Sequence, residues 1–267
     1  MSAPATSGSR FGRVVGASIV GTTVEWYDFF LYGSAAALVF GPLFFPEQDD
    51  FVGVLAAFAT YAIGFAARPI GGLVFGHFGD RIGRKKLLVI SRLMMGGATF
   101  AIGLLPTYAT VGVLAPILLI ALRLIQGFAL GGEWGGAVLI VSEHGKPQHR
   151  GFWASWPQAG APAGQLISTG VLALLAAFQS DEAFAAWGWR IPFLLSAVLI
   201  LVGLWVRLAV NESPVFLEAQ RRAEEKARET GAAEQAPIAV VLRRYKREVL
   251  VAMGARIAEN VSFYILT

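Results

Sequence analysis

Six long stretches of mostly apolar residues follow one another along the chain, separated by short polar segments. Each is long enough to supply the roughly 20 apolar residues that a helix needs to cross the hydrocarbon core of a bilayer. The stretches cover approximately Val14–Phe40, Phe51–Phe75, Leu87–Leu105, Gly112–Val141, Phe152–Phe178 and Ile191–Val210. Lipid offers no hydrogen-bond partner to a backbone amide, so each stretch is predicted to be a transmembrane helix.

A seventh apolar run begins near Val249, and the sequence stops within it at Thr267. The polar segment before it is rich in Glu, Ala, Lys and Arg, a composition typical of a surface helix. We therefore predict an all-α integral membrane protein with a six-helix bundle and an incomplete seventh helix. Its parts are a cytoplasmic tail (1–13), the six-helix bundle (14–210), a cytoplasmic helical linker (211–246) and the incomplete seventh transmembrane helix (247–267).

Basic residues are concentrated on one side of the predicted membrane. They are Arg10, Arg13, Arg81, Arg84, Lys85, Lys86, Lys146 and Arg150, with more in the linker. The opposite side carries Glu47, Asp49, Asp50, Asp181 and Glu182, with Arg190 as its single cation. Because cytoplasmic loops are enriched in Lys and Arg, the N-terminus is predicted to be cytoplasmic, in a bacterial-type inner (plasma) membrane. Trp187, Trp189, Phe44 and Phe45 are then expected in the outer interfacial belt.

Composition narrows the possible functions. Apolar residues make up 55% of the chain and charged residues 15%, compared with about 25% charged in a soluble domain. There is no cysteine, and the three histidines lack metal-like spacing, so no metal site is predicted. The chain has no G-x-x-x-x-G-K-[ST] loop, so ATP-driven transport has no support. We predict no cofactor, no nucleic-acid partner and no enzymatic activity.

The first apolar stretch contains two carboxylates, Glu25 and Asp28. Residues three apart share a helix face, and this face also includes Gly21 and Tyr32. Two nearby acids in a low-dielectric site do not both ionise readily, so at least one is expected to bind a proton. The alternative interpretation is that they form packing hydrogen bonds to a neighbouring helix.

The fourth stretch contains Arg123, Gln126 and Glu133 on one face. At ~1.5 Å per residue, Arg123 and Glu25 both lie near the bilayer midplane. Arg123 is therefore predicted to pair with Glu25 or Asp28. Protonation of the carboxylate would release Arg123 to bind an anionic substrate. The alternative is a permanent buried ion pair that fixes the two helices.

Further polar residues in the apolar stretches are candidates for a substrate cavity. The predicted substrate-binding set is Tyr32, Arg68, Arg123, Gln126, Gln158 and Gln165. Arg92, nearer the cytoplasmic side, is instead expected to extend to lipid phosphates. Pro157 and Pro162 predict a bend in the fifth helix. Gly127, Gly131 and their neighbours predict close helix packing.

The motif G-x-x-x-D-R-x-G-R-K within Gly76–Lys86, together with Arg123–Gly127, resembles the first half of a major facilitator transporter. Four further runs resemble the metabolite:proton symporter family, nearest to its shikimate-transporter branch. They begin at Glu25 (EWYDF), Gly131 (GGEWGG), Trp187 (WGWRIPF) and Glu212 (ESPVF). The resemblance implies proton-driven uptake of a small organic acid, such as shikimate, by alternating access.

The resemblance also implies a cytoplasmic gate of charged residues, similar to the signature of sugar porters. Its members here would be Asp80, Arg81, Arg84, Glu143, Arg150 and Glu212. Since surface ion pairs contribute at most about 1 kcal/mol each, only a network of them would bias the transporter between two states.

Members of the family have twelve helices in two six-helix halves with the substrate between them. The implied partner is therefore a missing C-terminal six-helix half, whether this chain is a fragment or the second half is a separate chain. Three other functions stay open: proton symport of a zwitterionic osmolyte such as proline or betaine, proton-driven export, and a half-length membrane protein without transport of its own.

Overall fold

The computed structural model describes residues 8–82, 84–144, 149–208, 218, 221–222 and 245–266. Within these helices, the side chains at 79–82, 84–85 and 132–144, among others, lie outside the described part. The chain divides into two units, residues 1–217 and 218–267, which are treated separately below.

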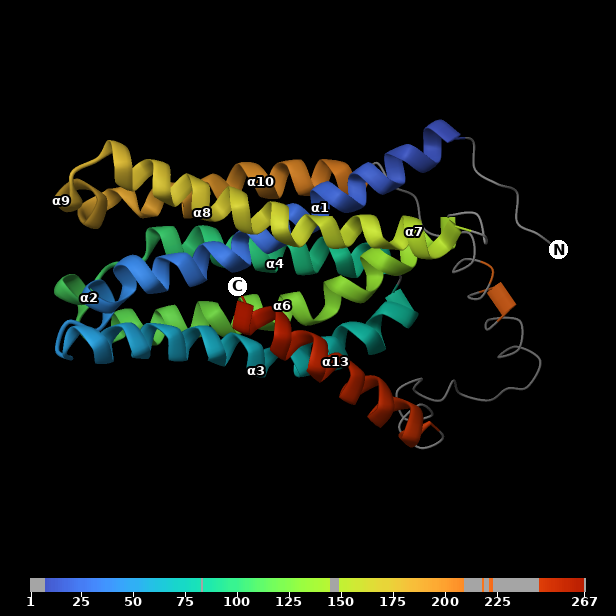
Figure 1. Ribbon diagram of the computed structural model, residues 1–267, viewed down its shortest axis with the longest axis horizontal. Coiled ribbons are helices and arrows are strands. Elements are labelled where there is room, and N and C mark those ends of the chain that lie inside the picture. Colours follow the sequence, from blue (N-terminus) through green and yellow to red (C-terminus); the bar gives the residue numbers. More distant parts are fainter. Residues whose placement is uncertain are drawn as a thin grey trace. The chain divides into compact units, whose positions relative to one another are not determined.

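The described part of the first unit is built from helices and connecting turns (Figure 1). These are α1 (Gly8–Ala35), a π-helical turn (Ala36–Phe40), α2 (Gly41–Phe44), α3 (Asp50–Ile82), α4 (Arg84–Leu104), α5 (Tyr108–Val111), α6 (Leu114–His144), α7 (Arg150–Ser155), a 3-10 turn (Trp156–Ala159), α8 (Gly160–Phe178), α9 (Asp181–Ala183), a second π-helical turn (Phe184–Gly188) and α10 (Arg190–Leu208). The most extensive helix contacts join α3 with α6, α1 with α8, and α4 with both α10 and α6.

Five helical segments are long and apolar enough to cross a membrane, at Val15–Phe44, Asp50–Phe78, Lys86–Leu104, Leu114–Gly131 and Gly151–Phe178. A sixth span results if Asp181–Gly188 and Arg190–Trp205, which meet at 41°, are counted together. The predicted all-α membrane fold is thereby confirmed for the described residues, with its spans in the predicted order. In the second unit, α13 (Lys246–Leu266) is helical, and its role as a seventh span stays a prediction.

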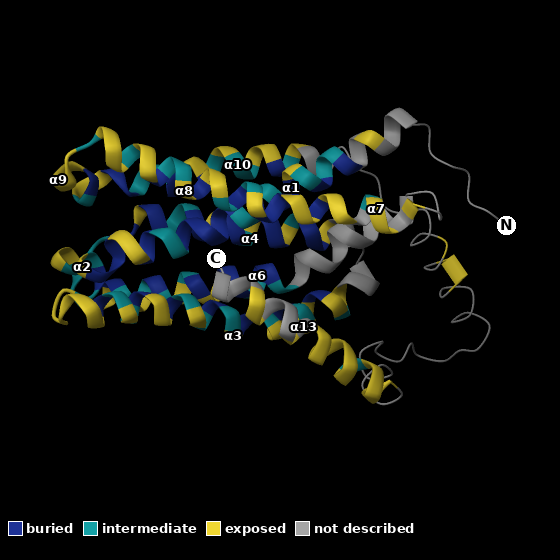
Figure 2. Cartoon of the chain, in the orientation of Figure 1, coloured by how far each residue is buried: buried dark blue, intermediate teal, exposed yellow. Residues whose placement is uncertain are grey.

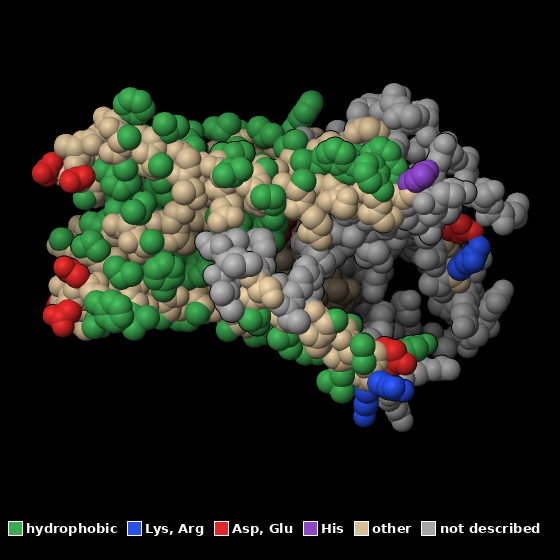
Figure 3. All heavy atoms as spheres, viewed as in Figure 1, with side chains coloured by type: hydrophobic (Ala, Val, Ile, Leu, Met, Phe, Trp, Pro, Cys, Tyr) green, Lys and Arg blue, Asp and Glu red, His purple; other side chains and the backbone are tan. Residues whose placement is uncertain are grey.

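Exposure and residue type follow the pattern expected of a bundle in lipid. Buried positions face inwards from α1, α4 and α6, and many outward positions are exposed (Figure 2). Hydrophobic side chains cover much of the described flank, while exposed acidic side chains gather at the end near α2 and α9 (Figure 3). These acidic residues are Glu47, Asp49, Asp50, Asp181 and Glu182.

Glycines bring the backbones of α3 and α6 into direct contact. A Cβ atom at Gly127 would lie 1.9 Å from the carbonyl oxygen of Gly64, and one at Gly71 would lie 1.9 Å from that of Phe128. A Cβ atom at Gly131 would lie 2.1 Å from the carbonyl oxygen of Arg68. Small residues allow such approach between membrane helices. The predicted packing role of Gly127 and Gly131 is confirmed.

A second glycine contact joins α1 to α8. A Cβ atom at Gly164 would lie 2.6 Å from the backbone nitrogen of Tyr27, and one at Gly160 would lie 2.8 Å from Thr22 Cβ. Just before this contact, the fifth span changes from α-helix to a 3-10 turn at Trp156–Ala159, which contains Pro157. Proline cannot donate the helical hydrogen bond, which explains the predicted irregularity there.

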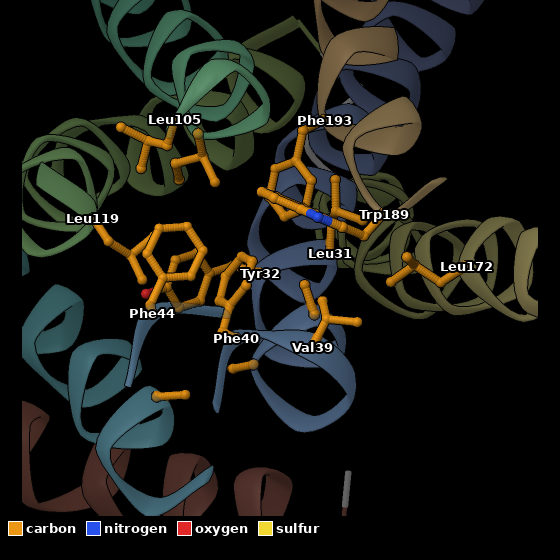
Figure 4. Packing of buried hydrophobic residues seen from close by; sticks show 14 of the residues in the cluster. Leu31, Tyr32, Val39, Phe40, Phe44, Leu105, Leu119, Leu172, Trp189 and Phe193 are labelled. Carbon is orange, nitrogen blue, oxygen red and sulfur yellow. The ribbon is translucent and has the colours of Figure 1, made fainter. Parts of the chain in front are cut away.

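Aromatic residues fill the core towards the acidic end, where both π-helical turns lie (Figure 4). The Phe40 ring lies 5.6 Å from Trp189 and 5.9 Å from Phe193, between ring centroids. Trp189 and Phe44 are completely buried. The prediction that they belong to the interfacial belt is therefore wrong, because they pack on each other and on Phe40 inside the bundle. Trp187 is 56% exposed, as a belt residue should be.

Candidate functional site

Arg123 of α6 is buried, at 1% exposed, and aromatic rings surround its guanidinium group. Its guanidinium carbon lies 4.3 Å from the ring centroid of Tyr32, 4.5 Å from that of Tyr61 and 4.9 Å from that of Phe29. These rings come from α1 and α3. A cation within about 6 Å of a ring face is attracted by the ring quadrupole, more strongly in a desolvated site. We call Phe29, Tyr32, Tyr61 and Arg123 the arginine cage.

The space for Arg123 depends on a glycine in α3. A Cβ atom at Gly64 would lie 2.7 Å from Arg123 Nε. The guanidinium is also oriented by hydrogen bonds. Arg123 Nη1 donates to Gln126 Oε1 at 2.9 Å, and Gln126 Nε2 donates to Thr99 Oγ1 of α4 at 2.8 Å. Thr99 in turn donates to the carbonyl of Met95. This chain of donors fixes both the amide and the guanidinium.

Tyr32 is held in the cage by α3. Its hydroxyl is hydrogen-bonded to Thr60 Oγ1, and Thr60 Oγ1 donates to the carbonyl oxygen of Ala57 at 2.6 Å. Because the single hydroxyl proton of Thr60 is used on Ala57, Tyr32 is the donor to Thr60. The oxygen of Tyr32 therefore keeps its capacity to accept a hydrogen bond.

Arg68 of α3 lies against the same group of rings. Its guanidinium carbon is 4.2 Å from the Phe65 centroid and 4.4 Å from the Phe29 centroid. Arg68 and Arg123 thus share Phe29 as a neighbour, and Arg68 is half-buried whereas Arg123 is buried. Two guanidinium groups therefore lie against the ring of Phe29.

The two predicted carboxylates are both buried in α1, with Glu25 1% and Asp28 0% exposed. Asp28 Oδ1 accepts a hydrogen bond from Ser196 Oγ of α10 at 2.6 Å. On the adjacent residue, Tyr27 donates to the carbonyl oxygen of Pro192 at 3.0 Å. Asp28 therefore faces α10. The predicted exchange of partners between Arg123 and these carboxylates stays a prediction.

The prediction for Arg92 is wrong. We expected Arg92 to extend to lipid phosphates, but it is completely buried. Its Nη2 donates to the carbonyl oxygen of Gly21 in α1 at 2.6 Å. The sequence does carry a signal for this, since Leu88, Arg92, Met95 and Thr99 recur every three or four residues, and all four are buried. The helical period therefore places Arg92 on the inward face of α4.

The remaining predicted substrate residues lie around the 3-10 turn and in α8. Gln158 is exposed and Gln165 is half-buried, while Ser168 Oγ donates to the carbonyl oxygen of Gln165. Their part in a substrate site stays a prediction. Sequence reasoning missed Phe29, Thr60, Tyr61, Thr99 and Ser196, which complete the polar and aromatic surroundings of the predicted residues. Thr60, Thr99 and Ser196 are polar residues within apolar stretches, and that property could have identified them.

The predicted gate residues cannot be placed. The side chains of Asp80, Arg81, Arg84, Glu143 and Arg150 lie outside the described residues, as does the whole of Glu212. At the opposite end, Tyr108 Oη donates to Glu47 Oε1 at 2.6 Å, and this hydrogen bond raises the pKa of Tyr108. Within the described part of the chain, no three His, Asp or Glu side chains are grouped as a metal site would require.

Comparison with known proteins identifies relatives along most of the chain. The family described as "Sugar (and other) transporter" matches residues 14–248. The inner membrane metabolite transport protein YhjE of Escherichia coli is 46% identical over 96% of this chain and 56% of its own length. The shikimate transporter of the same organism is 46% identical over 97% of this chain and 58% of its own length. Its proline/betaine transporter is 39% identical over 96% of this chain and 51% of its own length.

The fold is also similar to a solved structure. The proton:xylose symporter XylE, bound to 6-bromo-6-deoxy-D-glucose, superposes with a TM-score of 0.71 at 18% identity, over 82% of this chain and 49% of that chain. At this identity the likeness concerns the fold alone. The chain spans about half the length of the curated relatives it matches.

Proposed function

Because this chain belongs to the sugar (and other) transporter family of the major facilitator superfamily, we propose that it forms the first six-helix half of a proton-coupled importer of a small organic acid. Its relatives are multi-pass membrane transporters, and one is named as an inner-membrane protein. The proposed activity requires a second six-helix half to enclose the substrate path.

The arginine cage is the observation that carries this proposal. Ring faces and the amide oxygen of Gln126 hold the guanidinium of Arg123 inside the bundle. An ionisable residue inside a span is by default a candidate for substrate binding, and a guanidinium suits an anion. Arg68 lies against the same rings. The carboxylates Glu25 and Asp28 in the neighbouring turns of α1 provide a place for a proton. A carboxylate substrate and a proton are the ligands that fit these groups.

Uptake of labelled substrates tests the proposal. The protein, reconstituted with its second half in vesicles with an acidic exterior, is expected to accumulate shikimate or a related carboxylate, such as 2-oxoglutarate. Replacing Arg123 by Gln should abolish uptake, since the change removes the cation from the cage. Accumulation of betaine or proline alone would overturn the organic-acid proposal and favour the osmolyte alternative, which the proline/betaine relative supports. If none of these compounds is transported, the result would favour the alternative of a membrane protein without transport activity of its own.

We also propose that the acidic end of the bundle faces the periplasm and that the N-terminus is cytoplasmic. The exposed acids near α2 and α9 and the basic segments of the sequence support this orientation.

Single cysteines test the orientation directly, because the chain has no cysteine of its own. Asp49→Cys and Asp181→Cys are expected to react with a membrane-impermeant maleimide in intact spheroplasts. Ser9→Cys should react only after the membrane is permeabilised. The unmodified chain is the blank for this experiment. Labelling of Ser9→Cys alone in intact spheroplasts would invert the topology.

A further inference from the structure

We propose that Ser34 of α1 and Thr169 of α8 form a hydroxyl-binding subsite on the substrate path, so that the transported acid is a hydroxylated one. We call these two residues the hydroxyl pair. The choice of a hydroxy acid rests on the proposed function, whereas the position of the pair on a water-facing surface does not.

The hydroxyl pair joins two helices. Ser34 Oγ and Thr169 Oγ1 lie 3.5 Å apart, and either can be the donor. Thr60 and Ser168, by contrast, each donate to a carbonyl oxygen of their own helix. A Ser or Thr hydroxyl has one proton and two lone pairs. The bond within the pair uses one of its two protons, which leaves one donor and further lone pairs for a ligand that itself carries hydroxyl groups.

Both hydroxyls lie at mid-depth in their spans, which end at Phe44 and Phe178. At ~1.5 Å per residue, Ser34 lies about 15 Å from Phe44, and Thr169 lies about 14 Å from Phe178. The hydrocarbon core is about 30 Å thick, so both lie near its midplane. Thr169 is exposed and Ser34 is half-buried. Since polar groups at this depth are costly in lipid, their exposed side is expected to face a water-filled path.

The two flanks of α8 differ in polarity. Its buried face, which includes Gly164, packs on α1. On one flank of that face lie Gln165 and Thr169, which are one turn apart and therefore share a side of the helix. The other flank is apolar and carries the exposed side chains of Ile167 and Leu174. A helix with lipid on both flanks would be apolar on both, so the polar flank is assigned to the path.

The hydroxyl pair is continuous with the arginine cage. Gly33, the residue before Ser34, is half-buried, and a Cβ atom there would lie 3.4 Å from Tyr61 Cε2 and 3.7 Å from Tyr61 Oη. The ring of Tyr61 therefore lies on the α1 backbone beside Ser34. On its other side, the Tyr61 ring centroid is 4.5 Å from the guanidinium carbon of Arg123. The pair and the cage thus share Tyr61 as a neighbour.

One face of α3 continues this surface. Tyr61, Phe65 and Arg68 lie on that face, and all three are half-buried. The guanidinium carbon of Arg68 is 4.2 Å from the Phe65 centroid. Along the surface, hydroxyls are therefore followed by aromatic rings and then by a guanidinium. A small molecule with hydroxyl groups at one end and a carboxylate at the other matches this order, whereas betaine and proline carry no hydroxyl.

Single cysteines test whether the hydroxyl pair faces water. A thiol reacts with methanethiosulfonate reagents as the thiolate, which forms in water and not in lipid. In the protein with its second half, Ser34→Cys and Thr169→Cys are expected to react with a small charged methanethiosulfonate. Ile167→Cys and Leu174→Cys, at exposed positions on the apolar flank of α8, are the matched controls and should not react. Failure of both pair positions to react, or equal reaction at all four, would overturn the assignment.

Binding of two matched acids tests the subsite itself. Shikimate and cyclohex-1-ene-1-carboxylate have the same ring and carboxylate, but only shikimate has hydroxyl groups. Thr169→Val and Ser34→Ala are each expected to raise the Kd of shikimate about tenfold, by calorimetry on the reconstituted protein, and to leave that of the analogue unchanged. Thr169→Ser keeps the hydroxyl and should retain the affinity. Equal losses for both acids would show that the pair only packs α1 on α8.

The two experiments separate the inference from the proposed function. If neither acid binds while the cysteines react as expected, the organic-acid function has failed and the water-facing surface stands. If both acids bind the unmodified protein equally well, the hydroxyl subsite is overturned and the organic-acid function stands.

Discussion

Asp28→Asn is expected to abolish proton-driven accumulation while leaving exchange of substrate across the membrane intact. The asparagine keeps the shape of the side chain and can still accept a hydrogen bond from Ser196 Oγ, but it cannot take up a proton. A gradient of one pH unit supports up to about tenfold accumulation per proton. That accumulation should disappear, and the internal and external substrate concentrations should become equal.

Two assays in vesicles separate these effects. Uptake under an imposed pH gradient measures accumulation, and counterflow of labelled substrate without a gradient measures exchange. Asp49→Asn makes the same chemical change at an exposed position of the acidic end and should behave like the unmodified protein. Normal accumulation by Asp28→Asn would remove Asp28 from the coupling mechanism. Loss of exchange as well would show that Asp28 acts in binding rather than in coupling.

Gly127→Ala is expected to destabilise the bundle severely. The added Cβ would lie 1.9 Å from the carbonyl oxygen of Gly64 and 2.9 Å from its Cα, and both atoms belong to the backbone, so α3 and α6 must move apart. Overpacking commonly costs about 1–3 kcal/mol, and a clash between backbones belongs at the upper end or above it. The separation would also displace Arg123, which lies one turn away. Thermal unfolding followed by tryptophan fluorescence measures the loss.

Gly170→Ala is the matched control, because a Cβ atom there would meet nothing within 4 Å. In a helix this change alone should stabilise by roughly 0.5–1 kcal/mol. The expected results for the two glycines therefore differ in sign. Equal melting temperatures would show that α3 and α6 do not approach each other as closely as described.

The fold class was predictable because the bilayer allows few solutions. A stretch such as Phe51–Phe75 in lipid must be helical, and its length fixes a single crossing. Interior positions were harder to predict. Trp189 and Phe44 suit an interface by residue type, yet both lie inside the bundle, where two π-helical turns bring their rings together. Such turns have no signal in a single sequence.

The candidate site was predictable in part for the same reason. Glu25, Asp28 and Arg123 are conspicuous because ionisable residues are costly in lipid. Their neighbours depend on which helices pack together, and no spacing along the chain reveals this. Arg92 shows the difference well. Its position near the predicted cytoplasmic side favoured lipid phosphates, whereas the inward face of α4 brings it to Gly21.

The glycine contacts have a mechanical consequence. Where backbones touch, as at Gly127 with Gly64 and at Gly164 with Tyr27, few side-chain atoms lie between the helices. The pairs α3–α6 and α1–α8 are therefore each expected to move as a rigid body. Arg123 and Tyr61 of the arginine cage belong to the α3–α6 pair, and Phe29 and Tyr32 belong to the α1–α8 pair. Any tilt of one helix pair against the other must therefore move the guanidinium of Arg123 relative to the rings of Phe29 and Tyr32. The arginine cage thus lies where the two rigid helix pairs meet. An anion bound there would act directly on the movement of one pair against the other.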